Sequence, residues 1–154
     1  MSQENNADIR RLLDIQEIAD AKARYGILVD GLVARPDDAA ALDELDSLFT
    51  ADAAFNFGGR IGTFSGKAAL RRFYGAVLPG ERQWVWHSFS NPLIEVRGDE
   101  ATAQWTIYAL AVSKGIDPWS QQVICGRYRD SHVRTPAGWR QSALIFIAEG
   151  LEGQ

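Results

Sequence analysis

The sequence has little of several residue types on which common protein functions depend. It contains a single cysteine, Cys125, so an internal disulfide is excluded. No cluster of lysine and arginine is long enough to follow a phosphate backbone, and the net charge is -4, so we expect no nucleic-acid partner. No apolar run approaches the roughly 20 residues that a membrane-spanning helix needs, and we expect no membrane partner.

Targeting and metal-binding signals are also scarce. The first residues, MSQENNADIRR, lack the apolar segment of a signal peptide, so the expected location is cytoplasmic. The two histidines, His87 and His132, lie far apart among scattered carboxylates, so we predict no metal site. Gly58 and Gly59 indicate a turn, because no phosphate-binding glycine pattern follows a strand there.

Aromatic and aliphatic residues, by contrast, are plentiful. The 154 residues include five Trp, seven Phe and four Tyr, and 46% are hydrophobic, which indicates a folded chain. A chain of this length is the size of one domain and buries about two thirds of the surface that its unfolded form exposes. No repeat or linker divides it. We therefore expect a disordered N-terminus at residues 1–7, one domain at 8–149 and a flexible C-terminus at 150–154.

The first half of the chain has the periodicity of helices. Apolar residues recur at three- and four-residue steps from position 8 to about 33, which predicts a long amphipathic helix with a break near Asp14. Pro36 ends it, since the residue before a proline avoids helical angles. A second helix is predicted at 40–49, a short strand at 53–57 and a third helix at 67–77.

The second half has the composition of strands. Segments rich in β-branched and aromatic residues alternate with turn signals and predict an antiparallel meander over 84–89, 93–97, 101–113, 121–134 and 138–149. Helices followed by long strands argue for an α+β fold, in which three helices from the N-terminal half cover one face of a curved mixed or antiparallel sheet. Such a cone-shaped sheet encloses a concave pocket, where small-molecule sites are commonly found.

His87 lies within an aromatic run, WVWHSFSNP, that is predicted to be a strand. Alternation places Val85, His87 and Phe89 on one face of this strand and Trp84 and Trp86 on the other. Two interpretations are open. His87 is either a core histidine satisfied by the backbone or a general acid and base in a dry pocket.

Two residues of the first helix are candidate partners of His87. Tyr25 lies on the apolar stripe, and Asp30 sits among apolar residues near the C-terminal end, where the macrodipole disfavours an anion. An acid in that setting needs a partner, and an imidazole would serve. Alternatively, Asp30 caps the turn into Gly31. The five-residue step places Asp30 about 140° around an ideal helix from Tyr25, so the two side chains would need a curved helix to reach one site.

Several short motifs follow one another in a characteristic order. They are ARY with an aspartate five residues after the tyrosine (23–30), LFTADAAF (48–55), GKAAL (66–70), HSFSNP (87–92) and GRYRD before GWR (126–140). In this order they resemble the SnoaL-like family of the nuclear transport factor 2 superfamily, over about residues 8–148. The positions of Tyr25, Asp30 and His87 resemble a subgroup similar to scytalone dehydratase and bile-acid dehydratase, although residues 101–113 lack the second histidine of scytalone dehydratase.

The resemblance implies an Asp30–His87 pair inside the cone, Tyr25 nearby, and a cofactor-independent dehydratase of a hydrophobic cyclic carbonyl compound (polyketide, aromatic or steroid-like). His87 would remove a proton next to the carbonyl, Tyr25 would donate to the carbonyl oxygen, and the imidazolium would protonate the departing hydroxyl. The alternatives are a ketosteroid-type isomerase and a non-catalytic small-molecule-binding protein of the same fold. The resemblance also implies a homodimer or higher homo-oligomer.

The remaining candidates are aromatic residues for the pocket wall and polar residues with structural roles. The predicted substrate-binding residues are Phe55, Phe57, Trp105, Tyr108, Tyr128 and Phe146, with Asn56 and Tyr108 as candidate polar members. His132 is predicted at an exposed rim, Cys125 as a small buried hydrophobic residue, and Asp52 in a cap or turn.

Overall fold

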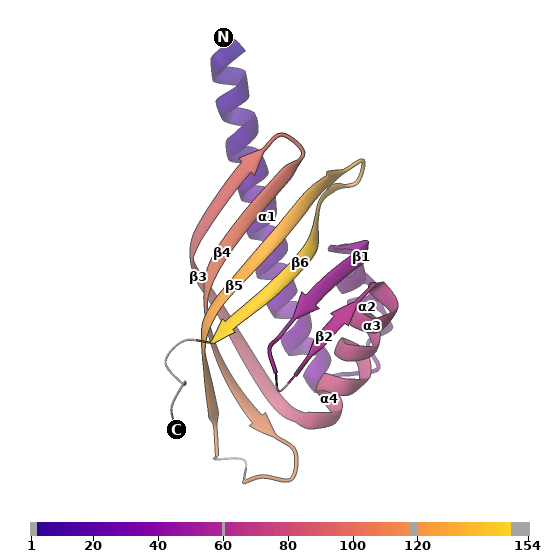
Figure 1. The fold of residues 1–154 in the computed structure, drawn as a ribbon. Helices are drawn as coiled ribbons and strands as arrows, with labels where there is room; N and C mark the ends of the chain where they lie inside the picture. Colours follow the sequence, from indigo (N-terminus) through magenta and orange to yellow (C-terminus); the bar gives the residue numbers. More distant parts are fainter. Residues whose placement is uncertain (1–2, 60, 118–119, 149–154) are drawn as a thin grey trace.

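The structure, a computed structural model, describes residues 3–59, 61–117 and 120–148 (Figure 1). Its helices are α1 (Gln3–Ala34), α2 (Ala39–Ser47) and a third helical stretch made of α3 (Lys67–Arg72), the π-helical turn η1 (Phe73–Val77) and α4 (Leu78–Glu81). Its strands are β1 (Phe49–Asn56), β2 (Thr63–Ser65), β3 (Arg82–Arg97), β4 (Glu100–Ser113), β5 (Gln122–Thr135) and β6 (Gly138–Ala148).

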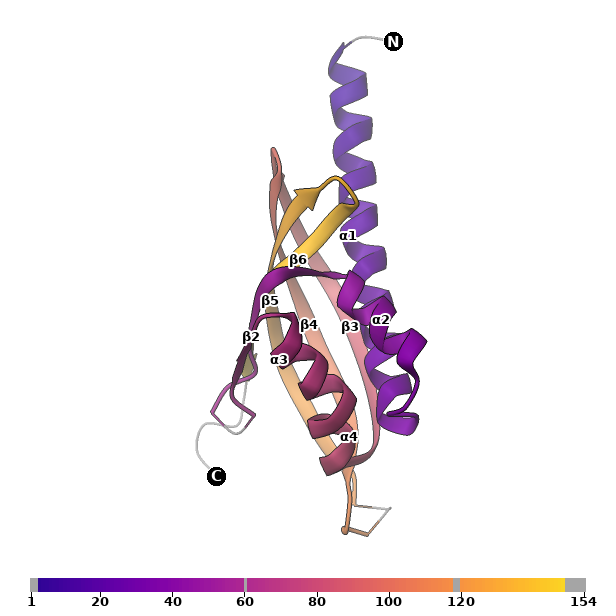
Figure 2. The same ribbon diagram turned by 90° about the vertical axis from the view of Figure 1, so that its right-hand side faces the viewer.

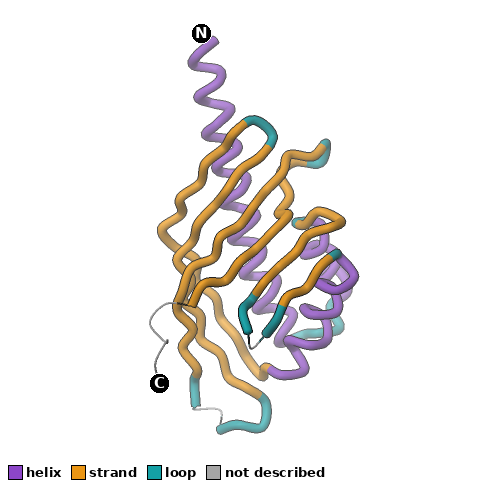
Figure 3. The backbone as a smooth tube through the Cα atoms, viewed as in Figure 1, coloured by secondary structure: helices purple, strands orange, loops and turns teal. Residues whose placement is uncertain are grey.

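The strands form one open mixed sheet in the order β2-β1-β6-β5-β4-β3. β1 and β6 are parallel, and the other neighbouring strands are antiparallel (Figure 3). Figure 2 shows the sheet curving past α1, with the shorter helices on the same side. The predicted α+β class, with helices on one face of a curved mixed sheet, is confirmed.

Several element boundaries differ from the prediction. α1 begins at Gln3, so the prediction of disorder is wrong for residues 3–7, and the helix passes Asp14 without a break. β1 begins at Phe49, which was predicted to end a helix, and β3 is one strand whose pairing is irregular between Ser90 and Leu93. Residues 1–2 and the segment 150–154, predicted to be flexible, lie outside the described residues.

Asp14 explains why α1 is continuous at the predicted break. Its buried carboxylate accepts two hydrogen bonds from Arg134, at 2.8 and 2.7 Å, and a third from the indole nitrogen of Trp139 at 3.1 Å. These bonds, chiefly the two from Arg134, lower the pKa of Asp14, although burial of the carboxyl opposes this shift. The aspartate therefore ties α1 to β5 and β6 instead of interrupting the helix.

Strand alternation decides which face of the sheet meets α1. On β4 the inward positions are Ala101, Ala103, Trp105, Ile107, Ala109 and Ala111, all buried. Opposite them, α1 presents the buried residues Ile18, Tyr25, Val29 and Leu32 at helical spacing.

None of the described helices combines the length and apolar composition needed to cross a bilayer.

Candidate active site

The structure brings His87 and Asp30 into direct contact. The ring atom Nδ1 of His87 lies 2.6 Å from Oδ1 of Asp30, and the backbone N–H of His87 donates to Oδ2 at 3.0 Å. One carboxylate therefore fixes both the ring and the strand that carries it. Because the carboxylate accepts at Nδ1, the tautomer that it favours leaves Nε2 as the basic nitrogen.

Gly26 makes this contact possible. A Cβ at this position would lie 3.0 Å from Cε2 of Phe89 and 3.9 Å from Cβ of His87. The missing side chain allows β3 to approach α1 closely. Asp30 stands one helical turn further along the same face, which explains how its short side chain reaches the strand.

His87 faces inward, on the face of β3 that the alternation predicted it to share with Val85. Val85 is buried on the same face, whereas Trp84 and Trp86 are 42% and 46% exposed on the other. The inward face borders a cavity of about 70 Å³ between α1, the third helical stretch and the sheet. The cavity lies over Ala109 and Ala111, where the small side chains leave space. Its other lining residues are Tyr25, Val29, Phe57, Ile61, Phe73, Tyr74, Leu78, Arg82, Val85, His87, Ile107, Ile124, Tyr128 and Phe146.

The predicted wall residues divide into two groups. Phe57, Tyr128 and Phe146 line the cavity. The other three do not line this cavity. Phe55 is packed against Phe49, with ring centres 4.9 Å apart; Trp105 lies buried beside Lys22; and Tyr108 is on the outer face, 42% exposed. The side chain of Asn56 accepts from the backbone N–H of Gly58 at 2.9 Å, and Asp52 is an exposed residue of β1.

Three tyrosine hydroxyls gather beside the cavity. The hydroxyl of Tyr25 lies 2.9 Å from that of Tyr74, and Tyr128 lines the cavity with them. Burial raises the pKa of Tyr25, Tyr74 and Tyr128 well above the usual value for a phenol. All three hydroxyls therefore keep their protons at neutral pH and can donate hydrogen bonds. Tyr74 falls within the third predicted helix and was not among the predicted wall residues.

A buried ion pair near the tyrosines was missed at the sequence level. Nζ of Lys22 lies 2.8 Å from Oδ2 of Asp130, and both side chains are almost fully buried. The ammonium also lies 4.5 to 4.8 Å from the ring centres of Tyr128, Phe89 and Tyr25. Burial lowers the pKa of Lys22 and raises that of Asp130, and each partner opposes that shift in the other.

A signal for this pair exists in the sequence. Lys22 falls between Ile18 and Tyr25 on the apolar stripe of α1, and Asp130 follows Tyr128 by two residues on β5, which puts both tyrosine and aspartate on one face. A lysine on one predicted buried face and an aspartate on another indicate a buried ion pair, because neither charge would be buried alone.

The same alternation corrects two other predictions. His132 is inward and 4% exposed, not at a rim, because Tyr128, Asp130 and His132 share the inner face of β5. Burial, followed by the nearby charge of Lys22, lowers the pKa of His132 to about 3. Cys125 has the opposite phase and is exposed rather than buried.

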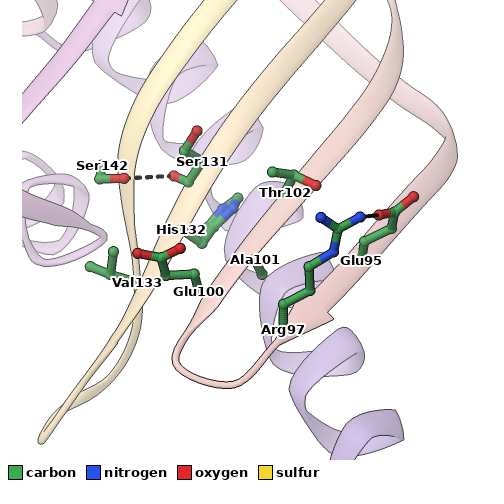
Figure 4. Close-up of a pocket in the computed structure, with 9 residues that line it drawn as sticks. All are labelled: Glu95, Arg97, Glu100, Ala101, Thr102, Ser131, His132, Val133 and Ser142. Carbon is green, nitrogen blue, oxygen red and sulfur yellow. Dashed lines mark hydrogen bonds and ion pairs between the residues drawn. The ribbon is translucent and has the colours of Figure 1, made fainter.

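A second hollow of about 310 Å³ is lined mainly by side chains of the outer face of the sheet. Figure 4 shows its residues, with the ion pair between Glu95 and Arg97 at 2.6 Å and the hydrogen bond from Ser142 to the backbone oxygen of Ser131. Most of its lining residues are polar, and they do not include His87. Among the described residues, no group of three or more His, Cys, Asp or Glu side chains is arranged to hold a metal ion.

Comparison with known proteins identifies relatives of this chain. A family model described as the SnoaL-like domain matches residues 10–144. Uncharacterized proteins of Mycobacterium tuberculosis and Mycobacterium bovis are each 30% identical to the chain over 132 residues, which cover 85% of this chain and 86% of theirs.

Solved structures share the fold at lower identity. An NTF2-like protein with a cystatin-like fold from Novosphingobium aromaticivorans is 26% identical, with a TM-score of 0.73 over 99% of this chain and 92% of that one. A candidate scytalone dehydratase from the same organism is 18% identical, with a TM-score of 0.75 over 91% and 87%. The hexachlorocyclohexane dehydrochlorinase LinA-type3 of Novosphingobium barchaimii is 20% identical, with a TM-score of 0.77 over 96% of each chain.

Proposed function

Because the chain belongs to the SnoaL-like domain family, we propose that it is a cofactor-independent lyase that removes water from a hydrophobic cyclic carbonyl compound. The observation that carries this proposal is the contact of 2.6 Å between Asp30 and His87 at the wall of an apolar cavity. A histidine held by a carboxylate is a base that can also return its proton as an acid.

The proposed reaction uses His87 twice. Nε2 takes a proton from the carbon next to the substrate carbonyl, and the carboxylate of Asp30 stabilises the imidazolium that forms. The negative charge moves to the carbonyl oxygen, where a hydroxyl of the Tyr25–Tyr74 pair donates a hydrogen bond. The imidazolium then protonates the hydroxyl on the neighbouring carbon, the C–O bond breaks and water leaves.

The size and lining of the cavity support a small apolar substrate. Its volume of about 70 Å³ is well below the roughly 300 to 1,000 Å³ of pockets for drug-sized ligands. A compound with one ring suits this space better than a steroid. The dehydrochlorinases of similar fold are named for a substrate with one six-membered ring, which is consistent with elimination on a compact ring.

An isomerase is the second candidate. Tyrosine hydroxyls beside the base would stabilise an enolate whether or not a leaving group is present. Dehydration and isomerisation therefore share the first proton transfer and differ in its fate. In a non-catalytic binding protein, the third alternative, Asp30 and His87 would only satisfy each other.

The test combines a substrate panel with a matched variant. Purified protein is incubated in deuterated water with cyclic β-hydroxy ketones and β,γ-unsaturated ketones, and the products are identified by NMR and mass spectrometry. Loss of water supports the lyase, whereas double-bond migration alone supports the isomerase. His87→Ala should lower either activity by about 10²- to 10⁴-fold, while Thr106→Ala, on the outer face of β4, should not. Full activity of His87→Ala would reject the mechanism.

A further inference from the structure

Arg82 differs from every other described residue that lines the cavity. It is the one permanently charged side chain in a lining of aliphatic, aromatic, tyrosine and histidine side chains. A guanidinium loses hydration energy beside apolar walls and is expected to have a partner there. Arg82 is half-buried, whereas the fully buried cation Lys22 has its own carboxylate in Asp130.

An irregularity in β3 turns Arg82 toward the cavity. Strict alternation from Val85 and His87 would place Gln83 inward and Arg82 outward. The register shifts between Arg82 and Trp84, where Arg82 pairs with Ser113 and Trp84 with Val112, so that Gln83 is an extra residue on β3. Such a bulge reverses the phase of the residue before it. Arg82 thus lies in the inward row of Ser113 and Ala111, at the end of the cavity next to the β4–β5 loop.

The present partners of Arg82 do not neutralise its charge. Its Nη1 atom donates to the hydroxyl of Ser113 and, at 2.6 Å, to the amide oxygen of Gln122. Both acceptors are neutral, and no carboxylate in the described part of the chain forms an ion pair with this side chain. Within the described residues, both hydrogen bonds of this guanidinium come from Nη1. Guanidinium nitrogens bind a carboxylate through two parallel bonds, which Nε and Nη2 can form.

We propose that Arg82 recognises a carboxylate on the substrate, so that the enzyme acts on a cyclic carbonyl compound bearing an acidic group. The specificity part of this inference rests on the proposed function of the same cavity, whereas carboxylate binding itself does not. Arg82 and His87 are five residues apart on one strand, which is at most about 16 Å between Cα atoms at about 3.3 Å per residue. The long arginine side chain spans part of that distance, and a single ring with a short acidic substituent spans the remainder.

The experiment uses two probes of the same shape, benzoate and benzamide, titrated into the full chain and followed by NMR shifts of backbone amides. Benzoate should bind at least about tenfold more tightly than benzamide, the usual effect of a charge-assisted hydrogen bond. Arg82→Gln should remove this preference and leave benzamide binding within about twofold, while Arg82→Lys should keep part of it. Arg97→Gln removes the same charge from an exposed site on the same strand and should change nothing.

The outcomes separate this inference from the proposed reaction. Equal binding of the two probes by the unaltered protein would overturn the carboxylate site without recourse to any variant. A preference that survives in Arg82→Gln but disappears in His87→Ala would also overturn it, because the histidine would then be the anion-binding group. A preference lost only in Arg82→Gln supports the site even if no dehydratase or isomerase activity is found.

Discussion

At the scale of single residues, the proposed chemistry depends on how one carboxylate holds one imidazole. Asp30 uses one oxygen for the ring of His87 and the other for its backbone, and Gly26 provides the close approach. An amide in place of the carboxylate keeps the shape but loses the charge that stabilises the imidazolium.

The first prediction concerns this substitution. Asp30→Asn should lower turnover by about 10²-fold or more, with the fold retained. The ¹⁵N shifts of the His87 ring should report a change in the tautomer population, because an amide can also donate to Nδ1. Unchanged ring shifts together with unchanged turnover would show that Asp30 has no role in orienting the histidine.

The second prediction concerns the buried ion pair. Lys22→Met leaves the Asp130 carboxylate buried without its partner and should cost about 3–5 kcal/mol of unfolding free energy. The double variant with Asp130→Leu should recover most of that loss, since two apolar residues replace the pair. Urea denaturation measures both. If the double variant is as unstable as the single one, the loss comes from packing of the lysine stem instead.

The third prediction follows from His132. Its pKa falls from 6.5 to about 3 on folding, so the unfolded chain binds the proton more readily between these values. The stability gained by keeping this imidazole neutral is present above pH 6.5 and is lost as the pH falls toward 3. The loss should reach about 3–5 kcal/mol over the window. His132→Gln should flatten the pH dependence of the unfolding free energy, measured in urea, between these limits. An unchanged pH dependence would show that other groups cause the loss of stability.

At the scale of elements, α1 is positioned by its attachments to β5 and β6. The fourth prediction is that Asp14→Ala costs at least about 2 kcal/mol, less than the 3–5 kcal/mol of a fully buried pair because Arg134 is partly exposed. Asp20→Ala removes an exposed aspartate of the same helix, bonded only to Gln16 in the described structure, and should cost about 0.5 kcal/mol or less. Thermal or urea unfolding compares the two variants.

Regular helices and strands were predicted from the sequence, whereas irregularities within them were not. Periodicity predicted α1, the long strands and the face that His87 shares with Val85, because a 3.6- or 2-residue repeat is a local property. The bulge at Gln83 and the π-helical turn at Phe73 arise from tertiary packing and have no such repeat. This is why Arg82 and Tyr74 were not predicted as cavity residues. Trp105 and Tyr108 were predicted from aromatic character alone, and they do not line this cavity.

At the scale of the whole molecule, the outer face of the sheet exposes Trp84, Trp86, Leu93, Tyr108, Val123 and Ile145. Exposed apolar residues gathered on one face of a sheet are typical of interaction surfaces. We propose that a second copy of the chain covers this face, as the family resemblance implied. Light scattering should give the mass of a dimer, and Trp86→Glu should shift it toward the monomer; a monomeric unaltered protein would contradict the proposal.

The pairing of β1 with β6 has a consequence for how the chain folds during synthesis. β1 lies early in the chain and its parallel neighbour β6 follows every other described element. Until β6 has left the ribosome, the hairpin of β1 and β2 has no neighbouring strand, and Phe146 cannot close the cavity. Ribosome-bound chains that stop before Gly138 should therefore remain protease-sensitive at β1 and β2.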